Sequence, residues 1–147
     1  MAPAVGFYKE QKEKKEEIEW KKALKHIGDG KINEAYSCVL AKHDDLLLIR
    51  LIGRTGIVIE QLDSHNTECL VKRMLDLIGS REFVDFLLPW ISACVDRRVQ
   101  MSIPLVRSIQ NCLRELVLLG RDAGIDEFQQ CEVKRVYAVL QDSPPGF

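Results

Sequence analysis

Two side chains that could hold a metal ion stand four residues apart in this chain. His65 and Cys69 would lie one turn apart on the same face of a helix. A zinc site needs four protein ligands, or three and a water, and the other histidines, His26 and His43, are far away in sequence. We therefore expect a surface histidine beside a buried cysteine, with no metal and no cofactor.

Two further patterns suggest chemistry but fit structural roles better. The run from Gly53 to Gly56 is rich in glycine, yet it lacks the spacer and the Lys-Ser/Thr ending of a phosphate-binding loop, and no strand precedes it. Asp44 and Asp45 precede an apolar run, where a carboxylate caps a helix and meets the positive end of its dipole. No Ser/His/Asp or Cys/His arrangement occurs in a strand-turn-helix context, so we expect no enzymatic activity.

The cysteines have the pattern of structural residues. Their number is odd and their spacing is wide, which suits a reducing compartment where cysteine acts as a small buried hydrophobe. They are Cys38, Cys69, Cys94, Cys112 and Cys131. We expect each of them in the core.

The composition excludes several classes of protein. Of 147 residues, 46% are hydrophobic and 29% are charged, with 21 Lys and Arg against 22 Asp and Glu. This balance argues against a wholly disordered chain and against a strongly cationic nucleic-acid-binding protein. No apolar run approaches the roughly 18 residues that cross a bilayer, and the opening residues MAPAVGFYKEQ lack the apolar core of a signal peptide. We expect a cytoplasmic protein without a nucleic-acid or membrane partner.

The elements that would position these residues are predicted to be helices. Apolar residues recur every three or four positions most clearly at 103–119, with Ser102 as a cap and Pro104 in the first turn. Similar patterns predict helices at 9–27, 31–43, 45–53, 55–63, 65–78, 81–97 and 125–141. At 45–53 the periodicity does not separate a buried strand from a helix, but no second alternating run exists to pair with it, so we expect a helix.

These segments predict an all-α fold. About seven to eight helices with short links fit either a compact bundle or a stack of helical hairpins. Pro89 predicts a kink or a break in its helix, with Trp90 beginning a new turn. We expect residues 1–17 to form a charged extension leading into the first helix, residues 18–141 a single helical domain, and residues 142–147 a tail.

Charge is unevenly distributed along the chain. Residues 70–121 carry eight basic and five acidic side chains, whereas the flanking segments 31–69 and 122–147 are acidic on balance. Seven of the eight are arginine, the residue best suited to bidentate carboxylate recognition. If several project from neighbouring helix ends, they would form a cationic face for an acidic protein surface; the alternative is that they are ordinary exposed residues on the backs of helices.

The string DDLLLIRLIGRTGIVIEQL, which begins at Asp44, resembles the signature of the C-terminal domain of the Tortifolia/Spiral family of plant microtubule-associated proteins. Trp20 and the segment AYSCVL at 35–40 resemble the opening helices of that family. The segment FVDFLLPWISACV at 83–95 resembles its helix with a Pro-Trp step. Ile57 stands where many members have a proline, a departure that affects a helix start and leaves the fold unchanged.

The resemblance implies a right-handed stack of helical hairpins, armadillo- or HEAT-like, similar to the C-terminal domain of the katanin regulatory subunit. It implies docking rather than catalysis, with tubulin or microtubules as partner, minus ends among the targets, and a place in cortical arrays of the cytoskeleton. The family's microtubule-binding helical repeats are absent here, so the chain resembles a fragment of a longer protein. The alternative is an interaction module that holds a helix of another cytoskeletal protein, or of a second copy, in an apolar groove around Phe86 and Trp90, with indirect effects on microtubules.

The candidate partner-binding residues follow from the acidity of tubulin, because a nearly neutral domain gains much only through a concentrated basic face. They are Lys72, Arg73, Arg97, Arg98, Arg107 and Arg114. The signature adds Asp44, Asp45, Arg50, Arg54 and Gly56. For the two arginines of the signature we favour a structural role, in which they extend from an apolar helix to Asp44, Asp45 or Glu60.

Overall fold

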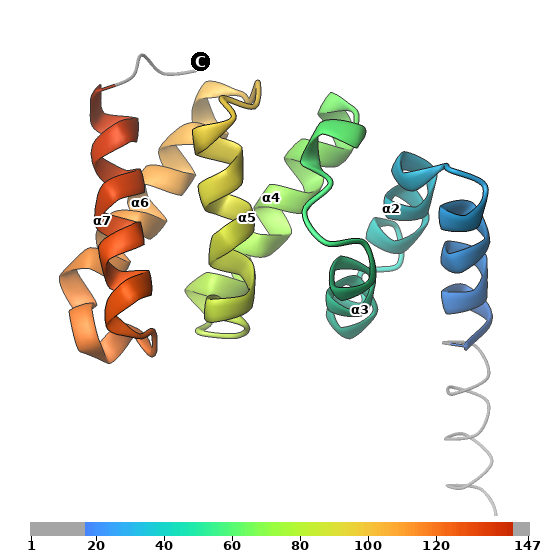
Figure 1. Ribbon diagram of the computed structural model, residues 1–147, viewed down its shortest axis with the longest axis horizontal. Coiled ribbons are helices and arrows are strands. Elements are labelled where there is room, and N and C mark those ends of the chain that lie inside the picture. The colour runs from blue at the N-terminus through green and yellow to red at the C-terminus, as the bar shows by residue number, and fades with distance from the viewer. Residues whose placement is uncertain (1–16, 143–147) are drawn as a thin grey trace, which may run out of the picture. The chain divides into compact units, whose positions relative to one another are not determined.

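A computed structural model describes residues 17–142, and the structural statements below refer to that range. Within it the chain forms seven α-helices and two short 3-10 helices, and no strand occurs there (Figure 1). The predicted all-α fold is therefore confirmed. The chain divides into two units, Met1–Leu62 and Asp63–Phe147, and each is described by itself. The charged extension and the tail fall almost entirely outside the described residues, and the single domain over 18–141 stays a prediction.

The N-terminal unit contains a first helix at residues 17–28, α2 at Ile32–Leu40, α3 at Asp45–Thr55 and a 3-10 turn at Ile59–Gln61. The ambiguous apolar run is helical and opens α3. The carboxylate of Asp44 caps this helix by accepting a hydrogen bond from the backbone N–H of Leu47 at 3.2 Å. Helical spacing turns Leu48 and Ile52 into the core but leaves Leu46 and Arg50 exposed. The run is thus amphipathic and not buried on all sides.

The helix predicted at 55–63 does not form. α3 continues through Thr55 and ends at Gly56, whose φ of +69° is a left-handed conformation that favours glycine. The next helix begins soon afterwards, because the carboxylate of Asp63 accepts a hydrogen bond from the backbone N–H of Asn66 at 2.7 Å. The residues between these two signals are too few for a stable α-helix, and they form only the 3-10 turn.

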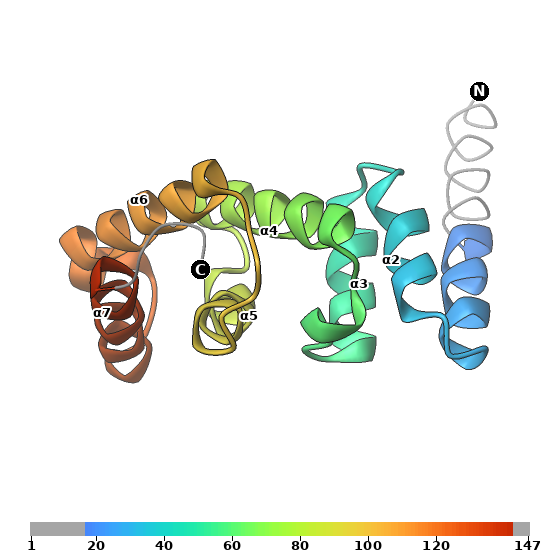
Figure 2. The same cartoon turned by 90° about the horizontal axis from the view of Figure 1, so that it is seen from above.

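The C-terminal unit is a stack of two helical hairpins. Its helices are α4 at Ser64–Gly79, α5 at Val84–Asp96, α6 at Ile103–Leu119 and α7 at Glu127–Asp142, with a 3-10 turn at Gly120–Ala123. Seen from above, α4 and α6 form one layer and α5 and α7 the other (Figure 2). Apolar side chains from all four helices fill the space between the layers, among them Leu70, Met74, Leu87, Ile91, Ile109, Leu113 and Val136.

Two polar contacts join α4 to α6 at either end. The carboxylate of Glu68 accepts hydrogen bonds from the backbone N–H of Ser102 at 2.7 Å and from its hydroxyl at 3.0 Å. A guanidinium nitrogen of Arg81 lies 3.1 Å from a carboxylate oxygen of Glu115. Both contacts join residues 34 positions apart, so the two helices run parallel. Ser102 does begin α6 as predicted, but its hydroxyl binds a neighbouring helix instead of capping its own.

Of the kink or break predicted at Pro89, the break does not occur, since α5 runs from Val84 to Asp96 as one helix, and the kink stays a prediction. Proline has no N–H, so it leaves the carbonyl oxygen of Asp85 without its helical donor. The side chain of Gln129 in α7 takes that place, donating from Nε2 to this oxygen at 3.0 Å. Trp90 starts no new turn; it lies in the core, 2% exposed.

Candidate partner-binding surfaces

Four of the six predicted basic residues lie on the two helices of one layer. Lys72 and Arg73 belong to α4, and Arg107 and Arg114 belong to α6, which contacts α4 directly. Lys72, Arg107 and Arg114 are exposed, and Arg73 is half-buried. The two arginines of α6 are seven positions apart, so they lie on the same face of that helix. We name these four residues the α4–α6 basic surface.

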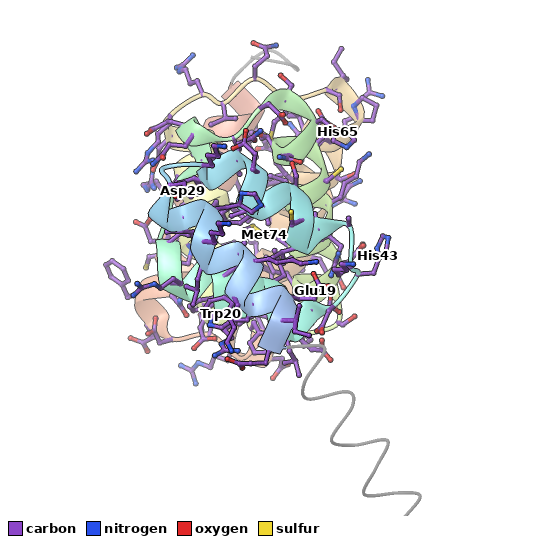
Figure 3. The ribbon with its side chains drawn as sticks, turned by 90° about the vertical axis from the view of Figure 1, so that its right-hand side faces the viewer. Glu19, Trp20, Asp29, His43, His65 and Met74 are labelled. Atoms are coloured by element: carbon purple, nitrogen blue, oxygen red, sulfur yellow. The ribbon has the colours of Figure 1, made fainter. Side chains whose placement is uncertain are left out.

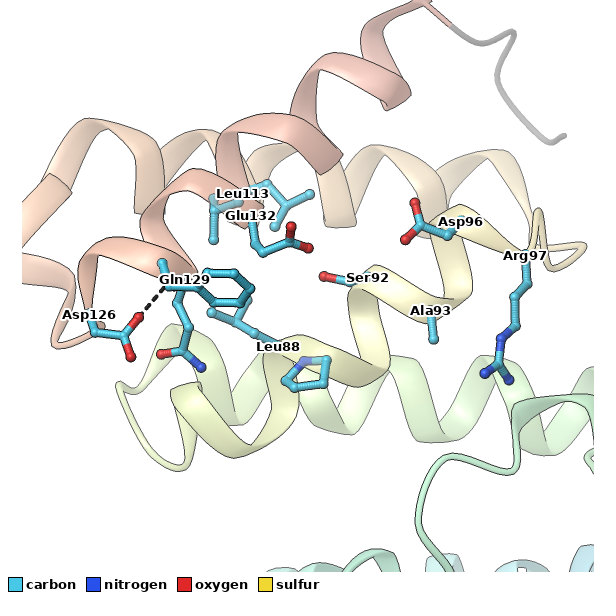
Figure 4. A pocket seen from close by; sticks show the side chains of 12 residues that line it. Leu88, Ser92, Ala93, Asp96, Arg97, Leu113, Asp126, Gln129 and Glu132 are labelled. Carbon is cyan, nitrogen blue, oxygen red and sulfur yellow. Dashed lines mark hydrogen bonds between the residues drawn. The ribbon is translucent and has the colours of Figure 1, made fainter.

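The other two predicted residues, Arg97 and Arg98, lie where α5 ends, in the opposite layer. Arg97 caps the helix C-terminus through its backbone, and Arg98 follows with a φ of +51°. Figure 4 shows the guanidinium of Arg97 pointing away from the carboxylate of Asp96. The structure therefore assigns the six predicted residues to two different places.

The two layers also differ in the charge of their helices. α4 and α6 together carry four basic and three acidic side chains. α5 and residues 127–141 of α7 carry two basic and four acidic side chains. The segment count along the sequence combined helices from both layers, so it could not reveal this difference.

A groove of about 540 Å³ lies between α5 and α7 (Figure 4). Its floor is apolar and includes Leu88, Val133 and Leu113, the last of which comes from α6. Pro89 and Phe128 add apolar surface, and Phe128 is 74% exposed. Carboxylates of Asp96, Asp126 and Glu132 line the same groove. We call it the α5–α7 groove.

Sequence reasoning predicted a groove on this helix but named the wrong residues. Trp90 is buried and does not line the α5–α7 groove, and Phe86, although 40% exposed, is not part of its lining either. The missed residue is Phe128, whose aromatic side chain follows the helix-capping Asp126 by two positions. A large apolar residue in the polar first turn of a helix is a signal that could have indicated an exposed position.

One arginine holds two carboxylates at the rim of the groove. Arg135 binds Asp96 with both terminal nitrogens at 2.9 Å and also lies 2.9 Å from a carboxylate oxygen of Glu132. These hydrogen bonds lower the pKa of Asp96 and raise the pKa of Arg135. At the other end, the carboxylate of Asp126 accepts the backbone N–H of Gln129 at 2.7 Å and caps α7 (Figure 4).

The signature residues mostly shape α3. Asp44 caps the helix, Asp45 lies in its first turn, Arg54 lies in its last turn and Gly56 ends it. The negative charges of Asp44 and Asp45 at the N-terminus of α3 and the positive charge of Arg54 near its C-terminus interact favourably with the helix dipole. The guanidinium of Arg50 lies over the ring of Trp20, 4.2 Å from its centroid, which is a partner that sequence analysis did not predict. Trp20 belongs to the first helix (Figure 3).

The predicted histidine–cysteine pair forms, and a second pair accompanies it. Nε2 of His65 lies 3.7 Å from Sγ of Cys69, and Nε2 of His26 lies 3.7 Å from Sγ of Cys38. His65 is exposed and projects outward in Figure 3, as expected. Among residues 17–142, no group of three or more His, Cys, Asp and Glu side chains could hold a metal ion.

The cysteines are less buried than predicted. Only Cys94 is buried, and Cys131 is exposed on α7. Burial raises the pKa of Cys94 to about 12 and that of Cys112 to about 11, the latter with help from the nearby charge of Glu115. These two thiols are therefore poor nucleophiles at neutral pH.

The described residues define an all-α helical protein whose C-terminal unit has exposed helix faces and a groove. Within the described range, no helix is both long and apolar enough to span a membrane. The family described as TORTIFOLIA1 C-terminal matches residues 17–140, and the chain belongs to this family.

Two proteins of Arabidopsis thaliana are similar to parts of the chain. TORTIFOLIA1-like protein 2 is 31% identical over 65 residues, which is 44% of this chain and 8% of that protein. TORTIFOLIA1-like protein 1 is 28% identical over 91 residues, which is 58% of this chain and 11% of that protein. The chain thus spans about a tenth of the length of these relatives.

Proposed function

We propose that this domain contributes to the association of a plant cytoskeletal protein with microtubules, by binding and not by catalysis. Membership of the TORTIFOLIA1 C-terminal family supports the proposal, because the family resemblance implies a microtubule-associated protein of the cortical array. The partner is tubulin, and the site of action is the cytoplasmic cytoskeleton.

The α4–α6 basic surface is the part of the domain that best fits an acidic partner. The observation that carries this assignment is the position of Lys72, Arg107 and Arg114, which are exposed on two adjacent parallel helices. Two of the acidic side chains on these helices already have partners, since Glu68 binds Ser102 and Glu115 binds Arg81. Lys72, Arg107 and Arg114 are the exposed cations of this surface that would meet carboxylates of the partner.

Arg97 and Arg98 contribute less in this proposal. They belong to the layer whose helices carry more acidic than basic side chains, and Arg97 borders the α5–α7 groove. The small net charge of the chain, -1, excludes adhesion by bulk charge, so binding must be local and sensitive to salt.

Co-sedimentation with microtubules at low and high salt tests the proposal. The triple variant Lys72→Ala, Arg107→Ala, Arg114→Ala should bind at least about threefold more weakly at low salt, because each exposed ion pair contributes up to about 1 kcal/mol. A matched control, Lys21→Ala, Lys22→Ala, Lys134→Ala, removes three exposed cations elsewhere and the same net charge. Absence of pelleting at low salt, or an equal loss in the control, would overturn the proposal.

A further inference from the structure

Hydrogen bonds between α5 and α7 keep the α5–α7 groove open, as in a preformed binding site. Ser92 and Ala93 are small side chains on the groove side of α5, and they leave space that α7 does not fill. Hydrogen bonds join the two helices on both sides of this space, from Gln129 to the carbonyl oxygen of Asp85 and from Arg135 to Asp96. The groove therefore keeps its width without a ligand, which reduces the entropy lost when a partner binds.

Exposed phenylalanines add apolar surface near the groove, beyond its floor. Phe83, Phe86 and Phe128 are at least 37% exposed, and they are all the phenylalanines within residues 17–142. All three lie at the starts of α5 and α7, the ends that Gln129 and Asp85 hold together. Of the three, only Phe128 lines the groove, and Phe83 and Phe86 are exposed at the start of α5 outside the lining. Exposed phenylalanines near an apolar groove are typical of interaction sites, because covering them removes apolar surface from water.

The charge at the groove selects the partner. Asp96 and Glu132 are already paired with Arg135. Asp126 keeps carboxylate oxygen free for a further donor, because one of its oxygens accepts the N–H of Gln129 while each carboxylate offers about four acceptor positions. Its neighbour Glu127 and the exposed Asp85 lie at the same starts of the two helices. A cation is therefore favoured at this end, beside the exposed ring of Phe128.

We propose that the α5–α7 groove binds an amphipathic helix of another protein, with an apolar stripe on the groove floor and lysine or arginine at the end near Asp126. A helix fits because two helices lying side by side leave a furrow along their axes, and the described residues offer no strand edge to which an extended peptide could add. The volume of about 540 Å³ is within the usual range of ligand sites.

This partner differs from the one assigned to the α4–α6 basic surface. An acidic surface such as that of tubulin would meet like charge at Asp126, Glu127 and Asp85. The inference is therefore independent of the proposed function, and each can fail without the other.

Two synthetic peptides of about 18 residues, long enough to form a helix in the groove, test the proposal. They share one leucine and alanine stripe and differ only at one end, which carries lysines in the first peptide and glutamates in the second. Fluorescence anisotropy should show that the lysine peptide binds at least tenfold more tightly than the glutamate peptide. Absence of binding, or equal binding of the two peptides, would overturn the proposal.

Two variants locate the site. Phe128→Ala should weaken the lysine peptide about tenfold, because it removes an apolar wall. Asp126→Asn should reduce the preference for lysine severalfold without loss of folding, because asparagine caps a helix as well as aspartate does. The control is Leu118→Ala, which removes a side chain that is 80% exposed on α6 and is not part of the groove.

Comparison of the two alanine variants decides whether the peptide binds in the groove. Unchanged binding in Leu118→Ala together with weaker binding in Phe128→Ala supports the groove as the site. Equal losses in these two variants would overturn it. Light scattering separates a second possible occupant: self-association of the chain that Phe128→Ala abolishes would assign the groove to a second copy and would also overturn the proposal.

Discussion

Gln129 donates a hydrogen bond from Nε2 to the backbone carbonyl oxygen of Asp85, at a distance of 3.0 Å. This oxygen is the acceptor that Pro89 leaves without a helical N–H, four residues further along α5. A side chain from α7 thus completes the hydrogen bonding of α5. The same bond holds the starts of the two helices together at one end of the α5–α7 groove.

Because of this bond, the loss of stability caused by replacing Gln129 should depend on which residue stands at position 89. Gln129→Ala should lower the free energy of unfolding by about 0.5–1.5 kcal/mol, the usual contribution of one hydrogen bond. In a Pro89→Ala background the helix regains its own donor to Asp85, so the same substitution should cost clearly less. Urea unfolding followed by circular dichroism at 222 nm measures both effects.

Gln141→Ala is the matched control for this cycle. Gln141 is also on α7 and donates to the hydroxyl of Tyr137 at 2.8 Å, a contact that does not involve α5. Its cost should be the same with proline or alanine at position 89. An equal cost of Gln129→Ala in both backgrounds would show that the side chain does not replace the missing donor.

The buried phenol of Tyr36 should make the folded protein less stable at high pH. Burial raises the pKa of this phenol from 10.0 to about 12, although a hydrogen bond with Thr55 at 2.7 Å acts in the opposite direction. The unfolded chain loses the proton first, so the contribution is complete below pH 10 and is lost as the pH rises through 12. The loss should reach about 2–3 kcal/mol for a shift of this size.

Urea unfolding between pH 8 and pH 12, in steps of about one pH unit, checks this expectation. Tyr36→Phe should have a flatter profile above pH 10, even if it is less stable at neutral pH through loss of the bond to Thr55. Identical profiles for the parent and Tyr36→Phe would contradict the assignment.

The cysteines should react with iodoacetamide in order of exposure and thiolate content. Cys131 is exposed and should be alkylated first, whereas Cys94, buried with a pKa raised to about 12, should be last. Cys112, with a pKa raised to about 11, should also be slow. Peptide mass spectrometry of a time course at neutral pH gives the order.

Unfolding in urea provides the control for the alkylation experiment. Without the fold the desolvation of the thiols disappears, so the rates at the five cysteines should converge. A folded protein in which Cys94 reacts as fast as Cys131 would contradict the burial described here.

Arg50 should stabilise the N-terminal unit through Trp20. Its guanidinium lies over the indole ring, so Arg50→Ala should lower the free energy of unfolding by about 0.5–1 kcal/mol. Arg54→Ala, on the same helix and also exposed, is the matched control and should cost less. Chemical unfolding compares the two variants, and equal costs would argue that the stacking adds nothing.

The helices were predictable to the extent that local signals define them. The segment 103–119 matches α6, because apolar periodicity and Pro104 both act within a few residues of the helix they predict. The run after Asp44 was correctly predicted as helical. The helix predicted at 55–63 was wrong because α3 ends at the left-handed Gly56 and α4 is capped by Asp63, which leaves too few residues between them. Apolar periodicity alone detects neither of these signals.

The candidate surfaces were less predictable, since they depend on which helices become neighbours. The sequence identified Lys72, Arg73, Arg107 and Arg114 as candidates but grouped them with Arg97 and Arg98. Only the pairing of α4 with α6 separates the first four from the last two. In the same way, the groove was predicted around a tryptophan that the fold buries.

The amino-acid sequence by itself determined the all-α class, most helix boundaries and the family, because caps, glycines and apolar periodicity act between residues at most a few positions apart. Only the tertiary structure decided the continuity of α5 at Pro89, the stacking of Arg50 on Trp20 and the existence of the α5–α7 groove. Gln129 and Asp85 are 44 residues apart, and Arg135 and Asp96 are 39 apart. Contacts at such separations exist only after the helices have packed, and no local pattern specifies them.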